Sequence, residues 1–367
     1  PPRSTLFPYT TLFRSQGDIF AEQGQVDRAI QSYVLAIKHS NPVNPRSYFI
    51  LGQLQLGHGY YDEAAVNFHY YLKYEGLPEQ ARRIAQQNLD RCEFAISLKE
   101  NPVPFSPVNL GDSINSEFDE YVNGITADGE FLYFTRWDIR KEKFFDGRVM
   151  YNEDFYSARR SDGGWRKAMN LGPPVNTVLN EGAMSVAADG SLIFFSACNR
   201  DDGFGRCDLY QSKRISGKWT EPENLGEEVN SEEWDSQPCF SSDGKTLYFA
   251  SKRSGGKGSS DLWKSEMRPD GTWTLPENLG DSVNTPYEEM APFIHPDGQT
   301  LYFSSKAHPG MGGMDLFMSR KNGEQWSKPV NLGYPINTHA DEVTLIVETS
   351  GKDRKSTRLN SSHRIRY

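Results

Sequence analysis

A seven-residue phrase occurs five times in this 367-residue chain: Asn-Leu-Gly, two variable residues, then Val or Ile and Asn. The copies begin at Asn109, Asn170, Asn224, Asn278 and Asn331, which lie 61, 54, 54 and 53 residues apart. Regular self-similarity at such a period is typical of propellers and solenoids, because one unit cannot bury its apolar face without its neighbours. The sequence therefore constrains the fold more than it constrains any chemistry.

Three further features repeat in step with this phrase: an Asp-Gly pair before an aromatic run, an Asp followed by apolar and aromatic residues, and a Trp. The Asp-Gly pairs begin at Asp128, Asp189, Asp243 and Asp297, the later aspartates are Asp154, Asp208, Asp261 and Asp315, and the tryptophans are Trp165, Trp219, Trp273 and Trp326. Asp-Gly between two extended runs is a strong hairpin signal. In the third unit, the four expected strands are 235–240, 246–251, 261–267 and 272–279. Four short strands per unit, with no helix between units, predict β-propeller blades.

The blade count follows from the ends of the repeat. Four units are complete, and a fifth supplies its linking phrase and a first strand over 342–347. Residues 105–111 are expected to form an outermost strand that closes the ring. The prediction is a five-bladed propeller with an incomplete last blade. The excess length of the first unit falls in 136–153, which predicts an enlarged surface hairpin, and such loops often carry binding functions.

Both termini read like translated sequencing adapter, TLFPYTTLFRS at the start and DRKSTRLNSSH near the end. We therefore expect residues 1–15 and 353–367 to be adapter-derived and disordered, and the native chain to have continued on both sides. The formal net charge of −9 includes +2 from the first segment and +4 from the second, which leaves −15 for 16–352. Such an acidic chain argues against nucleic acid or an anionic membrane surface as a partner.

Residues 16–100 predict paired helices. A pattern of small residues and one aromatic recurs after 35 residues: Gly17, Gly24, Ala29 and Tyr33 are matched by Gly52, Gly59, Ala64 and Phe68. This pattern is similar to the tetratricopeptide repeat, although Tyr71 stands where a small residue is expected. A further helix over 79–98 is expected to cap the array and to pack Ile84, Leu89, Phe94 and Ile96 against the second helix pair. The predicted fold class is therefore α + β multidomain, with tetratricopeptide α-hairpins in 16–100 followed by a WD40-like propeller in 101–352.

The order of these segments resembles one family. CEFAISLKENP and NLGDSINSEFDEYVNGITADGEFLYFTR, followed by blades with DG..LYF.S and W..P.NLG, are similar to OmpA-family, peptidoglycan-associated outer-membrane lipoproteins that carry tetratricopeptide and WD40-like (PD40) repeats. The type IX secretion component of this architecture is the nearest comparison. The resemblance implies a periplasmic, outer-membrane-associated protein with an N-terminal lipid anchor and a C-terminal peptidoglycan-binding domain, both outside 16–352.

Two sets of residues are candidate sites. Acidic residues occupy one aligned position of the repeat: Glu120, Glu181, Asp235, Glu289 and Glu342. They could line the mouth of the channel and bind a cation or a basic segment, or they could form hydrogen bonds with the backbone of the neighbouring blade at each strand start. Cys198 and Cys207 flank a loop of the second blade and could form a disulfide if their Cα atoms approach within about 7 Å.

Other motifs are expected to be structural. The repeated Asn-Leu-Gly phrase fits a blade-to-blade connection, and the tryptophans fit packing between sheets. Asp201 and Asp202 only faintly resemble a calcium loop, which would need a bidentate Glu. Cys92 and Cys239 are expected to be buried and unpaired. The sequence has no paired-histidine spacing, nucleophile elbow or phosphate-binding glycine loop, so no catalytic, cofactor or metal residue is predicted.

These features predict a non-enzymatic interaction protein. The helical groove would hold a helix or an extended peptide of a partner, and the propeller would dock another cell-envelope protein or peptidoglycan-linked material. One alternative is a carbohydrate-active or peptidase-accessory propeller with a site in its channel, which needs two carboxylates within about 10 Å of each other. Another is a sensor that binds a small ligand in the ring. A docking module should instead show an apolar or aromatic patch on its helices.

Overall fold

The computed structural model describes residues 7–106, 108–143 and 149–347, and the chain divides into two compact units. Unit 1 comprises the helices as far as Pro104 together with the segments Pro309–Asp315 and Asn331–Glu342. Unit 2 comprises Phe105–His308, Leu316–Val330 and the chain from Val343. None of the helices in the described residues is both long and apolar enough to cross a membrane.

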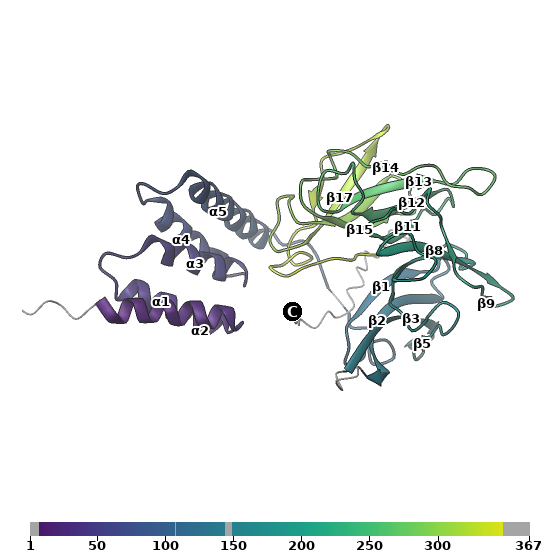
Figure 1. Cartoon of the computed structure of the whole chain (residues 1–367), viewed down its shortest axis with the longest axis horizontal. Helices are drawn as coiled ribbons and strands as arrows, with labels where there is room; N and C mark the ends of the chain where they lie inside the picture. The colour runs from purple at the N-terminus through teal and green to yellow at the C-terminus, as the bar shows by residue number, and fades with distance from the viewer. Residues whose placement is uncertain (1–6, 107, 144–148, 348–367) are drawn as a thin grey trace, which may run out of the picture. The chain divides into compact units, whose positions relative to one another are not determined.

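Unit 1 contains α1 (Phe7–Glu22), α2 (Val26–Lys38), α3 (Pro45–Leu56), α4 (Tyr61–Leu72) and α5 (Glu79–Glu100) (Figure 1). Close contacts between glycines and aromatic rings join the helices in pairs. A Cβ on Gly17 would lie 2.7 Å from the ring of Tyr33, and one on Gly52 would lie 3.0 Å from the ring of Phe68. The small and aromatic residues that recur after 35 positions therefore pack α1 on α2 and α3 on α4.

Two expectations about the helices need correction. Residues 7–15, predicted to be disordered, belong to α1, and the ring of Phe13 lies 5.9 Å from that of His39 just after α2. An apolar residue that meets the next helix is enough to extend α1 by several turns. The buried face of α5 consists of Ala85, Leu89, Cys92 and Ala95, whereas Ile84, expected to pack inward, is 36% exposed.

Four antiparallel sheets follow, one for each complete repeat, and we call them blades 1 to 4. Blade 1 contains β1 (Glu120–Ile125), β2 (Phe131–Lys143), β3 (Val149–Ser161), β4 (Gly164–Trp165) and β5 (Met169–Asn170). Blade 2 contains β6 (Glu181–Val186), β7 (Leu192–Cys198), β8 (Cys207–Ile215), β9 (Lys218–Trp219) and β10 (Glu223–Asn224). Blade 3 contains β11 (Asp235–Phe240), β12 (Thr246–Ser251), β13 (Asp261–Glu266) and β14 (Glu277–Asn278). Blade 4 contains β15 (Glu289–Ile294), β16 (Thr300–Ser305), β17 (Asp315–Asn322), β18 (Gln325–Trp326) and β19 (Val330–Asn331).

The Asp-Gly pairs form the turn between the first and second strands of each blade. In blade 3, Gly244 has a φ of 71°, which favours glycine, and Asp243 Oδ1 accepts a hydrogen bond from Lys245 N at 3.1 Å. The other three pairs have glycines with φ between 65° and 70°. The hairpin prediction is therefore confirmed at all four positions.

Apolar side chains join consecutive blades. The innermost strands contact one another in the order β1, β6, β11, β15. Trp273 of blade 3 lies 5.8 Å from the ring of Phe194 in blade 2, and Trp326 of blade 4 lies 6.5 Å from Tyr248 in blade 3. The expected packing of tryptophans between sheets is thus seen at these two positions.

A further cluster brings the fourth blade back to the first. Ile346 is buried with Ile114 and Val122 of the first repeat, and Phe293 from β15 packs against the same cluster. The sheets therefore follow one another around a circle, which is the arrangement of a β-propeller. The described residues contain four blades.

Two expected strands are missing from the described residues. Strand pairing is absent from 105–106, 108–111 and 342–347. Residue 107 lies outside the described part of the chain. The strand expected to pair with 342–347 would begin beyond residue 347, so the segment contributes buried side chains without a ladder. A fifth blade therefore stays a prediction.

The innermost strands end the sheets, and neighbouring side chains satisfy their free backbone groups. Each of β6, β11 and β15 contains a bulge with one residue at positive φ: Ala183 at 51°, Gln237 at 54° and Ala291 at 49°. Gln237 N donates to Ser196 Oγ at 3.0 Å, and Ala291 N donates to Gln237 Oε1 at 2.8 Å. Each blade thereby protects the edge of the next.

Candidate functional site

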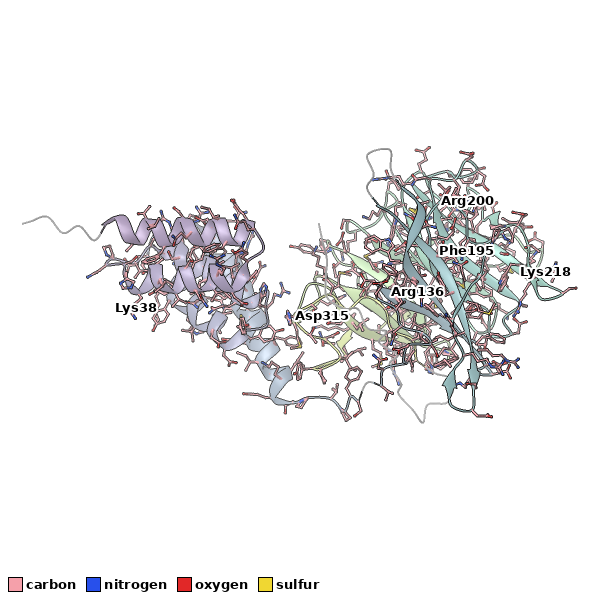
Figure 2. The ribbon with its side chains drawn as sticks, turned by 90° about the horizontal axis from the view of Figure 1, so that it is seen from below. Lys38, Arg136, Phe195, Arg200, Lys218 and Asp315 are labelled. Carbon is pink, nitrogen blue, oxygen red and sulfur yellow. A yellow bond between two sulfur atoms is a disulfide. The ribbon has the colours of Figure 1, made fainter. Side chains whose placement is uncertain are left out.

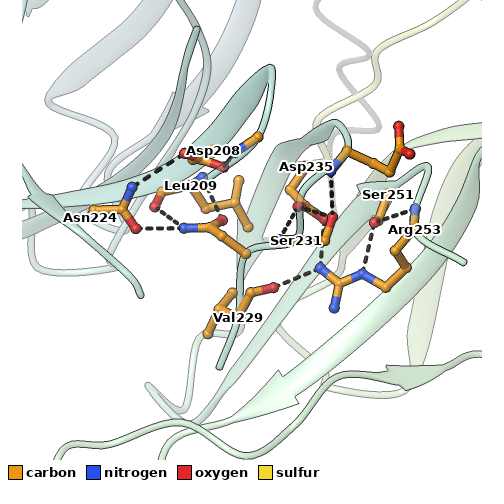
Figure 3. A network of polar contacts seen from close by, with 11 residues as sticks. Asp208, Leu209, Asn224, Val229, Ser231, Asp235, Ser251 and Arg253 are labelled. Atoms are coloured by element: carbon orange, nitrogen blue, oxygen red, sulfur yellow. Dashed lines mark hydrogen bonds and ion pairs between the residues drawn. The ribbon is translucent and has the colours of Figure 1, made fainter. Parts of the chain in front are cut away.

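The five aligned acidic residues are all buried, with at most 5% of their surface exposed. In blade 3, Asp235 Oδ2 accepts hydrogen bonds from Ser231 N at 2.7 Å and Ser231 Oγ at 2.6 Å (Figure 3). The Ser or Thr four residues before each of the other carboxylates does the same: Ser116 for Glu120, Thr177 for Glu181, Thr285 for Glu289 and Thr338 for Glu342. The structure places four of these carboxylates at the starts of the innermost strands and Glu342 in a segment without strand pairing. All five are bonded to the linking segment just before them, whereas the second sequence interpretation placed the partners in the neighbouring blade.

A cation completes this arrangement in blades 1 and 3. Arg253 Nη2 lies 2.5 Å from Asp235 Oδ1 and donates to Val229 O at 2.6 Å (Figure 3). Arg136 Nε lies 2.8 Å from Glu120 Oε1, and its Nη2 donates to Ile114 O at 2.7 Å. Each guanidinium therefore ties the buried carboxylate to the linking phrase that precedes it. We call this carboxylate, hydroxyl and cation set the carboxylate clamp.

Blades 2 and 4 vary the cation. Arg200 Nη1 is 3.9 Å from Glu181 Oε1, and the guanidinium lies 4.8 Å from the centre of the Tyr210 ring; Figure 2 labels Arg136 and Arg200. In blade 4 the corresponding residue is His308, whose Nε2 lies 2.9 Å from Val283 O. Because a carbonyl oxygen only accepts, Nε2 carries the hydrogen. Burial raises the pKa values of Glu181 and Glu289.

The later aspartate of each repeat organises the loop before it. Asp208 accepts hydrogen bonds from Phe204 N at 2.6 Å and Gly205 N at 3.1 Å, and from Asn224 Nδ2 at 3.4 Å. Burial raises the pKa of Asp208. The loop is thereby bonded to the first Asn of the linking phrase (Figure 3).

The second Asn of the phrase holds the third strand of the preceding blade. Asn230 Oδ1 accepts from Leu209 N at 2.8 Å, and its Nδ2 donates to Leu209 O at 3.1 Å and Asn224 Oδ1 at 2.8 Å (Figure 3). Asn284 makes the same contacts with Leu262 and Asn278. The recurring phrase is therefore a structural connection, as expected from its regularity.

A Gly-X-Gly motif, absent from the sequence predictions, lies in the loop between the second and third strands. It occurs at 203–205, 256–258 and 310–312. A Cβ on the second glycine would collide with backbone carbonyls of the next linking loop: Glu233 O for Gly205, Tyr287 O for Gly258 and Ala340 O for Gly312. The second glycine always lies three residues before the later aspartate of its repeat, which is Asp208, Asp261 or Asp315. This fixed spacing is the signal that could have revealed the motif.

The cysteines and the neighbouring aspartates lie in the loop of blade 2. Cys198 and Cys207 face each other across β7 and β8 and form a disulfide with a Cα–Cα distance of 4.0 Å. Asp202 Oδ1 accepts from Tyr210 Oη at 2.9 Å. Within the described part of the chain, no three His, Cys, Asp or Glu side chains are grouped to hold a metal ion. Cys92 and Cys239 are free and buried, and burial raises the pKa of each thiol to about 12.

One buried carboxylate lies outside the repeated set. Glu153 Oε1 accepts a hydrogen bond from Tyr121 Oη at 3.1 Å, and both side chains lie against Gly182 of the next blade. Burial raises the pKa of Glu153. Such a carboxyl group can retain a proton at higher pH than an exposed one. It lies at the base of the expected hairpin of blade 1, part of which, 144–148, is outside the described residues.

Unit 1 carries an aromatic surface formed by Tyr48, Tyr70 and Tyr74, which we call the tyrosine cluster. The rings of Tyr48 and Tyr70 stack with centroids 5.3 Å apart, and Tyr74 lies 6.3 Å from Tyr48. Tyr70 is 48% exposed. These residues come from α3, α4 and the turn after α4.

Comparisons with solved structures find similarity to propeller-containing chains. TolB from Acinetobacter baumannii matches at 14% identity over 70% of this chain and 60% of that chain, with a TM-score of 0.41. The putative TolB from Agrobacterium tumefaciens matches at 16% identity over 62% of this chain and 87% of that chain, with a TM-score of 0.35. A thermostable family-43 glycoside hydrolase matches at 13% identity over 60% of this chain and 76% of that chain, with a TM-score of 0.37. No protein-family model and no curated protein matches this sequence.

These comparisons correct the prediction that the chain is not an enzyme. Glycoside hydrolases are among the chains of similar fold. The prediction depended on the structural character of the repeated motifs, but a fold hosts different functions through sites grafted onto it. Regular blades therefore do not exclude catalysis.

Proposed function

We propose that this chain is a docking scaffold of the cell envelope, in which tetratricopeptide-like helices and a five-bladed, WD40-like propeller each hold a partner protein. The observation that carries the proposal is the tyrosine cluster. Contiguous aromatic rings that reach the surface are typical of protein interaction sites, because tyrosine supplies a large contact area with only two side-chain torsions to fix. In this cluster Tyr70 is exposed, and Tyr48 and Tyr74 are half-buried.

The tyrosine cluster is ordered before any partner binds. The stack of Tyr48 on Tyr70 is flanked by Lys73, whose ammonium lies 5.2 Å from the centre of the Tyr70 ring. Tyr74 Oη donates to Val43 O at 3.4 Å. Binding then requires little further ordering of side chains, which favours affinity.

The finer assignment rests on the sequence motifs. We propose a periplasmic protein associated with the outer membrane, of the OmpA-related lipoprotein type and close to the type IX secretion component. Its partners would be other cell-envelope proteins. Contact with peptidoglycan would come through a C-terminal domain and contact with the membrane through a lipid anchor, both outside 16–352.

Photocross-linking tests the docking role. Benzoylphenylalanine would replace Tyr70 in the full chain, expressed in its own cells, with the neighbouring exposed residue His69 replaced in a control. The proposal expects a protein adduct at residue 70, identified by mass spectrometry as a cell-envelope protein, and at least several-fold less adduct at residue 69. The absence of an adduct at residue 70, or equal adducts at both positions, would contradict it.

A further inference from the structure

The Gly-X-Gly loops of blades 2 and 4 present their middle residues in the same way. In blade 2, Phe204 N and Gly205 N donate to Asp208 at 2.6 and 3.1 Å. In blade 4, Met311 N and Gly312 N donate to Asp315 at 2.9 and 3.0 Å. The second glycine of both loops lies against the backbone of the following linking loop. Phe204 and Met311 are therefore equivalent positions on a fixed backbone.

Within unit 1, helices cover Met311. Only 1% of its surface is exposed, and it belongs to the same cluster as Tyr61, Phe68 and Leu89 from α4 and α5. Tyr61 Oη donates to Met311 O at 3.3 Å, and the guanidinium of Arg91 donates to Gly312 O. A helical hairpin with an aromatic-lined apolar groove and an arginine thus recognises this loop by its side chain and by its two carbonyls.

The corresponding positions of blades 2 and 3 differ. Lys257 in blade 3 extends its ammonium to Asp281 at 2.9 Å, as suits a loop that faces water. Phe204 in blade 2 is 47% exposed, although contact of a large aromatic side chain with water is unfavourable. Among residues 7–106, 108–143 and 149–347, no hydrogen bond reaches the carbonyl of Phe204 or of Gly205. Blade 2 therefore offers the same three features that the helices contact in blade 4, and leaves them unused.

We propose that the Phe204 loop docks a helical hairpin of a partner protein, in the way that the Met311 loop holds α4 and α5. The partner would supply an apolar groove lined by aromatic residues for the Phe204 ring and an arginine for the Gly205 carbonyl. A second copy of this chain does not fit, because Met311 already fills the groove of its α4 and α5. This inference rests on the proposed docking function and names the surface and the kind of partner.

The disulfide supports this role. Cys198 and Cys207 close the base of the loop that carries Phe204, and blades 3 and 4 have no cysteine at these positions. A loop held at its base loses less conformational freedom on binding. The loop with the exposed aromatic is thus also the one with a covalent constraint.

The test places benzoylphenylalanine at residue 204 of the full chain in its own cells, with residue 257 as the matched control on the equivalent loop. We expect about tenfold more adduct at residue 204 than at residue 257, as for a central contact and a solvent-exposed one. Mass spectrometry should locate the adduct on a pair of adjacent helices of a different protein. Phe204→Lys should lower co-purification of that protein by about tenfold, whereas Lys257→Ala should leave it unchanged.

Several results would overturn the inference: equal adducts at residues 204 and 257, an adduct on a strand, a loop or a lipid, or unchanged co-purification with Phe204→Lys. The melting temperature of Phe204→Lys should stay within about 2 °C of the parent, because the side chain is half exposed. If residue 204 fails while residue 70 still yields its envelope-protein adduct, the docking function stands and this surface is wrong. If both positions fail, the proposed function falls with it.

Discussion

Blades 3 and 4 are built on the same pattern, but their carboxylate clamps contain different cations. Asp235 of blade 3 is paired with Arg253 at 2.5 Å, and the arginine also reaches Val229 O. In blade 4, His308 reaches the equivalent carbonyl of Val283 at 2.9 Å, while Glu289 is bonded to Thr285 and Ser305. One clamp contains a permanent positive charge, and the other contains an imidazole bonded to the carbonyl of the linking loop.

The difference teaches which parts of the clamp the fold requires. Both blades keep the backbone N–H and hydroxyl bonds to the carboxylate and the bond to the linking-loop carbonyl. The position of each strand is therefore set by hydrogen bonds that do not depend on the cation's charge. The charge changes only how strongly the buried carboxylate is compensated, so the repeat can vary it from blade to blade.

Removing the permanent cation should have the largest effect. Arg253→Leu leaves Asp235, which has no exposed surface, as a buried and unpaired charge, and should lower the free energy of unfolding by about 3–5 kcal/mol. His308→Leu should lower it by about 1 kcal/mol at pH 8, because a neutral imidazole contributes one hydrogen bond. Chemical denaturation of both variants measures the difference. Equal losses of unfolding free energy in the two variants would show that the arginine and the histidine contribute equally to their clamps.

Blade 2 differs from blades 3 and 4 by a disulfide bond at the base of its loop. The paired change Cys198→Ser and Cys207→Ser opens a loop whose ends are nine residues apart, and should lower the free energy of unfolding by about 2–3 kcal/mol. The loop itself should persist, because blade 3 forms the same bonds to Asp261 without cysteines. Amide hydrogen exchange at residues 204 and 205 follows the loop. A complete loss of protection there would show that the aspartate alone does not hold it.

The Gly-X-Gly loops should respond alike in blades 3 and 4. Gly258→Ala would place a Cβ against Tyr287 O and 2.6 Å from Thr285 O, and should lower the free energy of unfolding by about 2 kcal/mol. Gly312→Ala should cost a similar amount, since Thr338 O is also 2.6 Å away. Gly163→Ala is the control, because no atom lies within 4 Å of its Cβ. A neutral Gly258→Ala would show that the linking loop can move aside.

Acid should strengthen the clamps of blades 2 and 4. Burial raises the pKa values of Glu181 and Glu289 above their unfolded values, so the stability that the protonated forms contribute is present at low pH and is lost as pH rises through the folded pKa.

His308→Arg would place a permanent positive charge in the clamp of blade 4. The groups facing the imidazole are Val283 O, Glu289 and the rings of Phe303 and Phe317. The variant should be more stable than the parent by about 1 kcal/mol at pH 8, and this gain should shrink towards pH 5.5 as Glu289 takes up a proton. Denaturation curves across this range measure it. A gain that does not change with pH would mean that the protonation of Glu289 does not control the clamp.

Much of the blade structure could be predicted from local signals. The runs expected over 235–240 and 246–251 are β11 and β12, because an Asp-Gly turn fixes the register of both neighbours. The fourth strand of blade 3, expected over 272–279, is reduced to Glu277–Asn278. Trp273, with 5% of its surface exposed, packs on Phe194 and keeps only an isolated bridge to Met267.

The cations of the clamp were harder to find. The spacing from the carboxylate to its cation is 16 residues in blade 1, 18 in blade 3 and 19 in blade 4, because the intervening loop differs in length. The cation is also a histidine in one blade, so neither spacing nor residue type repeats. The helix over 7–15 was missed for another reason. The segment was assigned to sequencing adapter, and that origin does not predict whether Phe13 can pack against a residue at the end of α2.

Double-mutant cycles test the carboxylate clamp most directly. The cycle of Asp235→Asn with Arg253→Leu and the cycle of Glu289→Gln with His308→Leu would each be measured by chemical denaturation at pH 8 and pH 5.5. The account predicts a coupling energy of about 2 kcal/mol or more for the first pair and one below about 0.5 kcal/mol for the second pair, at both pH values. Equal coupling of the two pairs would contradict it.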